Sequence, residues 1–267
     1  MGSVVEKLEY GYRTLATGFG FAVFFTMGIV FRCTVCPFLA FWFRQSQRKK
    51  ELAARRVVQL SFAGFIATMR FLRVLDLTIV HEERLRDGAL ICPSHPTLID
   101  VVILISKIRN ANCIVKAALM ESAAMRGPIS TSGYITNDHG PELIDDCVAS
   151  LDKGDTLLIF PEGTRTKPGV KSRLQHGAAA VALAAHRNVT PVRITCEPPA
   201  LMKGIAWYTI PRTRMHITVD VLDEIDIKPF LENEHTQGRP IAVRHLTQYL
   251  FNVLFPHFSN SQNTKLS

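Results

Sequence analysis

The stretch ALICPSHPTLIDVVILISKI, residues 89–108, decides the fold that the sequence predicts. Its apolar start, Ala89–Cys92, is typical of a buried strand, and its end, Asp100–Ile108, is typical of a helix. Pro96 lies between them, where the start of a helix needs no backbone N–H. A strand followed at once by a helix is the repeating unit of α/β proteins. The stretch therefore predicts an α/β body.

The chain after Leu75 repeats this alternation of short apolar runs and helical patterns. Further strands are expected at 77–80, 113–115, 156–160, 191–195 and 215–221, and further helices at 141–151, 177–186 and 241–254. The fold class is therefore α/β, with a mixed, largely parallel sheet flanked by helices. We expect one such domain at 76–258, an N-terminal membrane-anchoring region at 1–75 and a polar, disordered tail at 259–267.

Size, composition and charge argue against a disordered chain and against a nucleic-acid-binding protein. With 267 residues, 47% hydrophobic and 20% charged, the chain can bury a core and is not of disordered composition. Most of the net charge of +8 lies in one basic cluster, which comprises Arg44, Arg48, Lys49, Lys50, Arg55 and Arg56. Because the remaining charge is nearly balanced, no nucleic-acid groove is expected, and the cluster suits an anionic membrane surface.

The cysteines indicate a reducing environment. Six cysteines are too few for a disulfide scaffold in a chain of this length. The close pair Cys33 and Cys36 lies in an apolar run without other metal ligands. We therefore expect reduced thiols, a cytoplasmic face and no metal site.

An apolar segment precedes the basic cluster. Thr14–Phe43 contains a single charge, Arg32, and as one helix would reach about 45 Å, more than the roughly 30 Å of a hydrocarbon core. Two arrangements fit: a tilted membrane helix over about 15–31, or a helical hairpin that bends near Arg32 and Pro37 and lies half-buried in one leaflet. Either places the body on the cytoplasmic side, at the inner membrane in a bacterium.

Two alternatives stay open for this N-terminal region. The apolar run could be the core helix of a soluble domain, although such long uniform runs are uncommon in cores. Residues 51–75 have a helical, amphipathic pattern with basic residues between the apolar ones. That helix would either lie on the bilayer or pack against the body.

His95 follows the strand of the opening stretch, at the edge where α/β active sites gather. Asp100 can reach back to the imidazole, and a carboxylate on one ring nitrogen leaves the other free as a base. Since no G-x-S-x-G turn supplies a nucleophile, the pair would activate a substrate hydroxyl, with backbone N–H groups near Pro96 as donors to the oxyanion. The alternative is a structural histidine with a helix-capping aspartate.

The second motif, F-P-E-G-T-R at 160–165, follows another predicted strand. Gly163 permits a tight turn, Thr164 adds a donor, and Arg165 offers a planar fork to phosphate. Further basic residues, at 167, 171 and 173, follow on the same loop. The alternative is an ordinary polar surface loop.

Together, H-x4-D and F-P-E-G-T-R resemble the glycerophospholipid acyltransferase family, whose best-known members are the 1-acylglycerol-3-phosphate acyltransferases. Lys116 resembles the family's lysine between the two blocks, and 133–139, G-Y-I-T-N-D-H, resembles its block G-x-I-F-I-D-R. His139 stands where that block has an arginine, which weakens one phosphate contact unless Arg126 compensates. The resemblance covers about 77–195.

The resemblance implies a membrane-bound O-acyltransferase in which His95 is the general base and Asp100 orients it. The hydroxyl of a lysophospholipid, lysophosphatidic acid above all, would attack the thioester of acyl-CoA or acyl-carrier protein. No bound cofactor is implied, and membrane lipids and the acyl donor are the expected partners. A different lipid acceptor, or a non-catalytic lipid-binding protein of the same fold, remains an alternative. The residues that the resemblance assigns to substrate binding are Lys116, Glu162, Gly163, Thr164 and Arg165.

Overall fold

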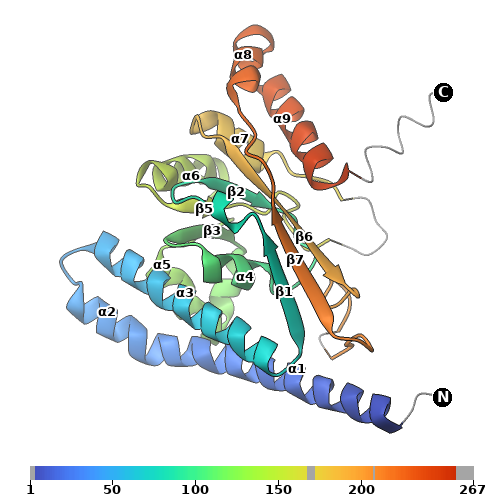
Figure 1. Cartoon of the computed structure of the whole chain (residues 1–267). Helices are drawn as coiled ribbons and strands as arrows, with labels where there is room; N and C mark the ends of the chain where they lie inside the picture. The colour runs from blue at the N-terminus through green and yellow to red at the C-terminus, as the bar shows by residue number, and fades with distance from the viewer. Residues whose placement is uncertain (1–3, 167–171, 207, 257–267) are drawn as a thin grey trace, which may run out of the picture.

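Figure 1 shows the computed structural model of the chain, which describes residues 4–166, 172–206 and 208–256. The described residues form a seven-stranded sheet in the order β1-β7-β6-β2-β5-β3-β4. β6 and β7 are antiparallel, and every other neighbouring pair is parallel. The predicted mixed, largely parallel sheet flanked by helices is therefore confirmed. The predicted tail at 259–267 lies outside the described residues.

Apart from α1, which begins at Val4 rather than near residue 15, the predicted elements agree with those of the structure within a few residues at each end. The strands are β1 (Leu75–Val80), β2 (Leu90–Pro93), β3 (Ala111–Val115), β4 (Ile135–Thr136), β5 (Thr156–Leu158), β6 (Val189–Glu197) and β7 (Met215–Val221). The helices are α1 (Val4–Val30), α2 (Cys36–Trp42), α3 (Gln47–Phe71), α4 (Asp100–Lys107), α5 (Ala123–Ser132), α6 (Leu143–Asp152), α7 (Gly177–Ala184), α8 (Lys228–Gln237) and α9 (Arg239–Leu254).

Three elements were not predicted, and each has a weak pattern in the sequence. α5 contains Gly127 and Pro128, β4 has only two residues, and α8 has no buried residue. Helix breakers and a lack of apolar periodicity conceal such elements from sequence reasoning.

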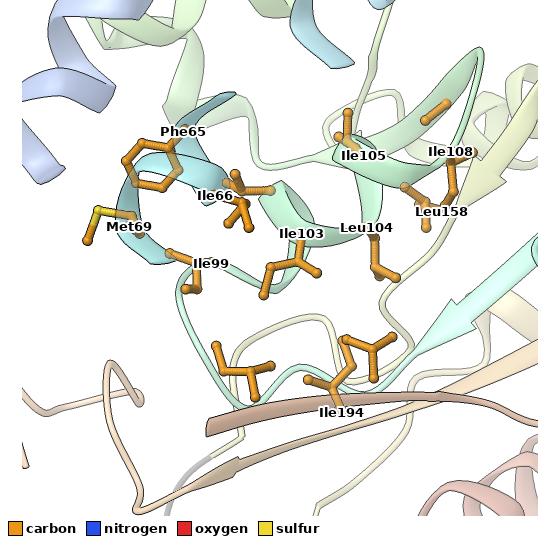
Figure 2. Packing of buried hydrophobic residues seen from close by; sticks show 14 of the residues in the cluster. Phe65, Ile66, Met69, Ile99, Ile103, Leu104, Ile105, Ile108, Leu158 and Ile194 are labelled. Atoms are coloured by element: carbon orange, nitrogen blue, oxygen red, sulfur yellow. The ribbon is translucent and has the colours of Figure 1, made fainter. Parts of the chain in front are cut away.

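Apolar side chains alternate between the two faces of the sheet and form two cores. In β2, Ile91 belongs to the core beneath α3 and α4, whereas Leu90 and Cys92 belong to the core beneath α6, α7 and α9. Figure 2 shows the first core, in which side chains of α4 lie between Phe65 of α3 and Ile194 of the sheet. A sheet covered on both faces explains why its strands are continuous apolar runs.

α1 and α2 form one continuous helix, and the chain reverses at 43–46 into α3. The predicted bend near Arg32 and Pro37 is therefore wrong. A π-helical turn, Phe31–Val35, joins the two helices directly before Pro37, which lies in the first turn of α2. In this wider turn the N–H groups bond to carbonyl oxygens five residues back, as Cys36 does to Phe31. The change of hydrogen-bond pattern just before Pro37 compensates for the missing N–H of proline, so the helix continues instead of breaking.

α3 packs against the body rather than lying free on a bilayer, because it contacts α1, α4 and α5. In the part of the chain that the structure describes, Glu6–Trp42 is the one helix long and apolar enough to cross a membrane. Only 17% of its apolar window is buried, which disfavours a core helix of a soluble domain. The exposed large apolar side chains of α1 to α3 are Leu8, Tyr10, Tyr12, Leu15, Phe19, Phe25, Ile29, Val30, Phe38, Phe41, Trp42, Leu52, Leu60 and Phe71.

Two arginines of the basic cluster point inward, which corrects the expectation that the whole cluster faces a membrane. Arg55 is buried, and its Nη1 lies 2.8 Å from Oδ1 of Asp155. Nη2 of Arg48 lies 2.6 Å from the same oxygen. Burial acts to raise the pKa of Asp155, but the two guanidinium groups outweigh it and hold that pKa well below its usual range. The ion pairs join α3 to the start of β5.

Glycines allow α1 and α5 to approach closely. A Cβ atom on Gly28 would lie 2.4 Å from the backbone oxygen of Ala124, and one on Gly127 would lie 2.7 Å from Cβ of Arg32. Arg32, the charge inside the apolar segment, donates from Nη1 to the oxygen of Ala123 at 3.3 Å. The N-terminal helix is thus fitted to the body at its centre.

Gly28→Ala is expected to lower the free energy of unfolding by about 1–3 kcal/mol, because the new methyl group meets backbone atoms of α5. Gly64→Ala is the matched control, since Gly64 is also helical but has no atom near its Cβ position. Gly64→Ala should raise the free energy of unfolding by up to about 1 kcal/mol, because alanine has a higher helix propensity than glycine. Chemical denaturation in detergent measures both, and equal stability of Gly28→Ala and wild type would contradict this packing.

Candidate active site

The predicted site residues gather at one edge of the sheet. β2, β5 and β3 are neighbouring parallel strands, so the residues that follow them meet at their carboxyl ends. His95 follows β2, Lys116 follows β3, and the loop 162–166 follows β5. Segments far apart in the sequence therefore meet at this edge.

The structure brings His95 and Asp100 together. Nδ1 of His95 lies 2.9 Å from Oδ2 of Asp100, which is the first residue of α4. The ring of His95 rests against Phe160, with 4.4 Å between the ring centroids, and its side chain stays 18% exposed. The contact with the carboxylate fixes the proton on Nδ1 and leaves Nε2 as the basic nitrogen.

The carboxylate of Asp100 also organises the start of α4. It accepts hydrogen bonds from the backbone N–H of Thr97, at 2.7 Å, and from the Thr97 hydroxyl. Burial raises the pKa of Asp100 above its usual value, while the bonds from His95 and Thr97 act to lower it. Asp100 thus orients His95 and fixes the turn before α4, but none of its described hydrogen bonds comes from an N–H of α4, so the alternative of a helix-capping aspartate is not supported.

Glu162 lies beneath the loop rather than at its surface. Its Oε1 accepts the backbone N–H of His95 at 2.9 Å, and its Oε2 accepts the hydroxyls of Thr166 and Ser172 at 2.8 and 2.7 Å. The backbone N–H of Thr166 donates in turn to the oxygen of His95 at 2.8 Å. These contacts join the two sequence motifs. The predicted contact of Glu162 with substrate stays a prediction.

Gly163, Thr164 and Arg165 form the outer part of this loop. Gly163 has a φ of +65°, which favours glycine. Nη1 of Arg165 donates to the carbonyl oxygens of Leu201 and Met202 at 3.2 and 3.4 Å. No described carboxylate lies within ion-pair distance of Arg165, so none of them neutralises its positive charge.

Lys203 is a cation of the site that sequence reasoning missed. Its Nζ donates to the hydroxyl of Thr164 at 2.8 Å, and the side chain is half-buried without an ion pair among the described residues. Leu98 donates its N–H to the oxygen of Leu201, so the segment around Lys203 also touches the His95 motif. A lone lysine in a segment without a recognisable motif gives no sequence signal, and only the fold places it here.

The remaining predicted residues make no hydrogen bond or ion pair, within the described ranges, to His95, Asp100 or the loop 162–166. Lys116 is exposed just after β3 and makes no hydrogen bond to the other predicted site residues within the described ranges. Nδ1 of His139 contacts Oδ2 of Asp146, and this hydrogen bond raises the pKa of His139. Arg126 lies on the exposed side of α5. The basic positions 167 and 171 fall outside the described residues.

An apolar cavity of about 250 Å³ adjoins the His95 motif. Leu98 and Ile99 of that motif line it together with Leu201, and its far end reaches α1, α3 and the start of β7. A cavity walled by aliphatic and aromatic side chains suits a hydrocarbon chain. The remaining lining residues are Thr17, Gly20, Phe21, Phe24, Phe25, Phe65, Met69, Leu75, Val101, Val102, Leu119, Met125 and Met215.

Two observations bear on ligands and mechanism. No group of three or more metal-binding side chains occurs among the described residues. The backbone N–H groups of His95, Thr97 and Leu98 are all engaged within the protein. The oxyanion donors that the sequence predicts near Pro96 are therefore not available among these three groups in this conformation.

Comparison with known proteins agrees with this geometry. Residues 76–195 match the family model described as Acyltransferase. Among solved structures, the 1-acyl-sn-glycerophosphate (LPA) acyltransferase PlsC from Thermotoga maritima is similar, with a TM-score of 0.69 and 20% sequence identity over 96% of this chain and 98% of that chain. At this identity the likeness shows the fold. No curated protein matches the sequence.

Proposed function

We propose that the chain is a glycerophospholipid acyltransferase, as the match of residues 76–195 to the Acyltransferase family model supports, and that it moves a fatty acyl chain from a thioester to a lysophospholipid hydroxyl. Acyl-CoA or acyl-carrier protein would be the donor, and lysophosphatidic acid the preferred acceptor. The observation that carries the proposal is the His95–Asp100 contact of 2.9 Å, at a sheet edge that also adjoins an apolar cavity.

Nε2 of His95 removes the proton from the acceptor hydroxyl as its oxygen attacks the thioester carbonyl. A carbon–oxygen bond forms, and the negative charge moves to the carbonyl oxygen. When the tetrahedral intermediate collapses, the carbon–sulfur bond breaks, and the leaving thiolate takes the proton from the imidazolium. The buried carboxylate of Asp100 stabilises that imidazolium and keeps the ring in position.

Arg165 and Lys203 would hold the acceptor's phosphate. Both cations lie beside Thr164 and have no carboxylate partner among the described residues. Arginine binds phosphate with two parallel N–H donors, and lysine adds a point charge. In place of the family's further arginine, this chain has His139 bound to Asp146, so the acceptor's phosphate would depend more heavily on Arg165 and Lys203.

The apolar cavity next to Leu98 would receive the acyl chain being transferred. Its wall is almost entirely hydrocarbon, and burying each methylene group there is favourable by roughly 0.8 kcal/mol. The acyl chain would enter from the bilayer side, since α1 and α3 supply part of the wall.

We propose that the α1–α2 helix lies in one leaflet rather than spanning the bilayer. The body packs against its central part, because the end of α1, the π-helical turn and α2 all contact the short helix α5. A spanning helix would need lipid around its middle, where Arg32 instead donates to Ala123. Basic residues flank both ends of the helix, with Arg13 near one end and Arg44 near the other.

His95→Ala is expected to lower kcat/KM by about 100-fold or more, because it removes the general base. Asp100→Asn should cause a loss of similar order, since an amide no longer favours the required tautomer. Release of free thiol from acyl-CoA in the presence of lysophospholipid measures both. His81→Ala is the matched control, because His81 also contacts an aspartate, Asp220, but lies outside the site. Equal activity of wild type and His95→Ala would refute the catalytic assignment.

Arg165→Met and Lys203→Met should each lower kcat/KM for lysophosphatidic acid by about 10-fold or more, mainly through KM. Monoacylglycerol, which has no phosphate, should show no such loss. Lys107→Met removes a charge elsewhere and controls for overall electrostatics.

An equal loss with both acceptors would contradict the phosphate contact. A preference of the wild type for another lipid would overturn the proposal that lysophosphatidic acid is the acceptor. Lipid binding without turnover on any acceptor would favour the non-catalytic alternative.

The leaflet arrangement places the first turns of α1 and the body on the same side of the membrane. We therefore expect Leu8→Cys and Asn252→Cys, in a background without Cys33 and Cys36, to react alike with an impermeant maleimide in sealed inside-out vesicles. Labelling of only Asn252→Cys would instead indicate a spanning helix.

A further inference from the structure

Four arginines gather around a hollow that the proposed reaction does not use. Arg13 comes from α1, Arg73 from the turn after α3, and Arg212 and Arg214 from the segment before β7. They line a cavity of about 370 Å³, together with Glu9, Tyr12 and Thr213. The start of α1, the end of α3 and the start of β7 meet at the lower right of Figure 1.

Positive charge in this arginine cluster exceeds what the protein neutralises. Nη1 of Arg214 lies 2.6 and 2.7 Å from the two carboxylate oxygens of Asp76. By contrast, no carboxylate within the described ranges lies at ion-pair distance from Arg13, Arg73 or Arg212. The Nε atom of Arg13 is buried, and no described group accepts its hydrogen bond. A buried donor without a partner is costly, so an anion in this hollow would remove a penalty.

Hydrogen bonds hold the cluster in place before any ligand arrives. Nη2 of Arg13 donates to the backbone oxygen of Arg212. The hydroxyl of Tyr12 donates to the oxygen of Leu72 at 3.2 Å, which joins α1 to the end of α3. Preorganised donors lose less conformational freedom on binding and therefore bind more tightly.

Arg73 stands where a helix end favours glycine. The N–H of Val74 donates to the oxygen of Met69 at 3.0 Å, which closes the end of α3, and Arg73 between them has a φ of +55°. Glycine adopts this conformation without the steric cost that a side chain adds. An arginine at this position sacrifices stability, which indicates a use for its charge.

The surroundings of the cluster indicate a lipid. Phe71, two residues before Arg73, is 85% exposed, and the exposed apolar face of α1 begins beside it. Thr17, one turn after Arg13, is 2% exposed and lines the neighbouring apolar cavity, and its hydroxyl has no described partner. The positively charged arginine cluster thus adjoins an exposed aromatic surface and an apolar cavity. A lipid with an anionic headgroup and apolar chains would find a partner for each of its parts here.

We propose that the arginine cluster binds the phosphate headgroup of an anionic membrane phospholipid, at a site separate from that of the reacting acceptor. Guanidinium groups from three segments present the forked donors that match phosphate oxygens. The lipid's chains would lie along the exposed apolar face of α1. A bound lipid would hold the N-terminal end of the helix at the level of the headgroups.

The test is calorimetric titration of the full chain in detergent with dihexanoylphosphatidylglycerol, dihexanoylphosphatidylcholine and inorganic phosphate. An Arg165→Gln background removes the acceptor site's contribution, and the readout is independent of acyl transfer. We expect the combined change Arg73→Gly and Arg212→Gln to weaken phosphatidylglycerol binding by about tenfold or more. Arg73→Gly alone should leave the melting temperature unchanged or raise it, which excludes misfolding as the cause.

Two controls match the variants. His186→Gly makes the same backbone change at the end of α7, where His186 has a φ of +49°. Arg109→Gln removes one exposed charge elsewhere. Neither should alter binding. The proposal is overturned if the double variant binds as wild type does, if Arg109→Gln weakens binding as much as Arg212→Gln alone, or if phosphatidylcholine or free phosphate binds as tightly as phosphatidylglycerol.

Discussion

The carboxylate of Asp100 lies at the first residue of α4, wholly out of contact with solvent, and accepts hydrogen bonds from His95 and Thr97. A buried charge is tolerated only where partners surround it, so the turn between β2 and α4 has little freedom to rearrange. α4 is in turn packed between α3 and the sheet (Figure 2). The position of the imidazole thus depends on the packing of the whole first core.

Glu162 does for the second motif what Asp100 does for the first. Its carboxylate joins the backbone of His95 to the hydroxyls of Thr166 and Ser172, and the loop that carries Arg165 is built over it. The oxygens of this carboxylate are directed at donors of the protein rather than at the outer surface of the loop. The acidic residue of F-P-E-G-T-R therefore shapes the loop, while the cations at its rim face outward.

The sequence predicted the α/β class and the His95–Asp100 contact because these depend on local patterns: apolar strands and a spacing of about one turn. The expectation that Pro96 lies at the start of the helix was wrong, because α4 begins only at Asp100. It did not predict Lys203, because the contact of Lys203 with Thr164 exists only after β5 and β6 have been placed by the sheet. It misjudged Arg48 and Arg55 for a related reason. A run of basic residues has no feature that tells which members will meet Asp155 from a distant strand.

The π-helical turn at Phe31–Val35 has a geometric consequence for the whole N-terminal helix. Such a turn holds one residue more than an α-helical turn, and each residue of an α-helix advances by about 100° around the axis. The aromatic side chains of α2, Phe38 and Trp42 among them, are therefore rotated by that angle relative to the stripe that an unbroken α1 would continue. The direction in which these side chains point around the helix axis is set by the number of residues in the turn, not by their type. No single substitution in α2 can therefore bring them back into line with the apolar stripe of α1.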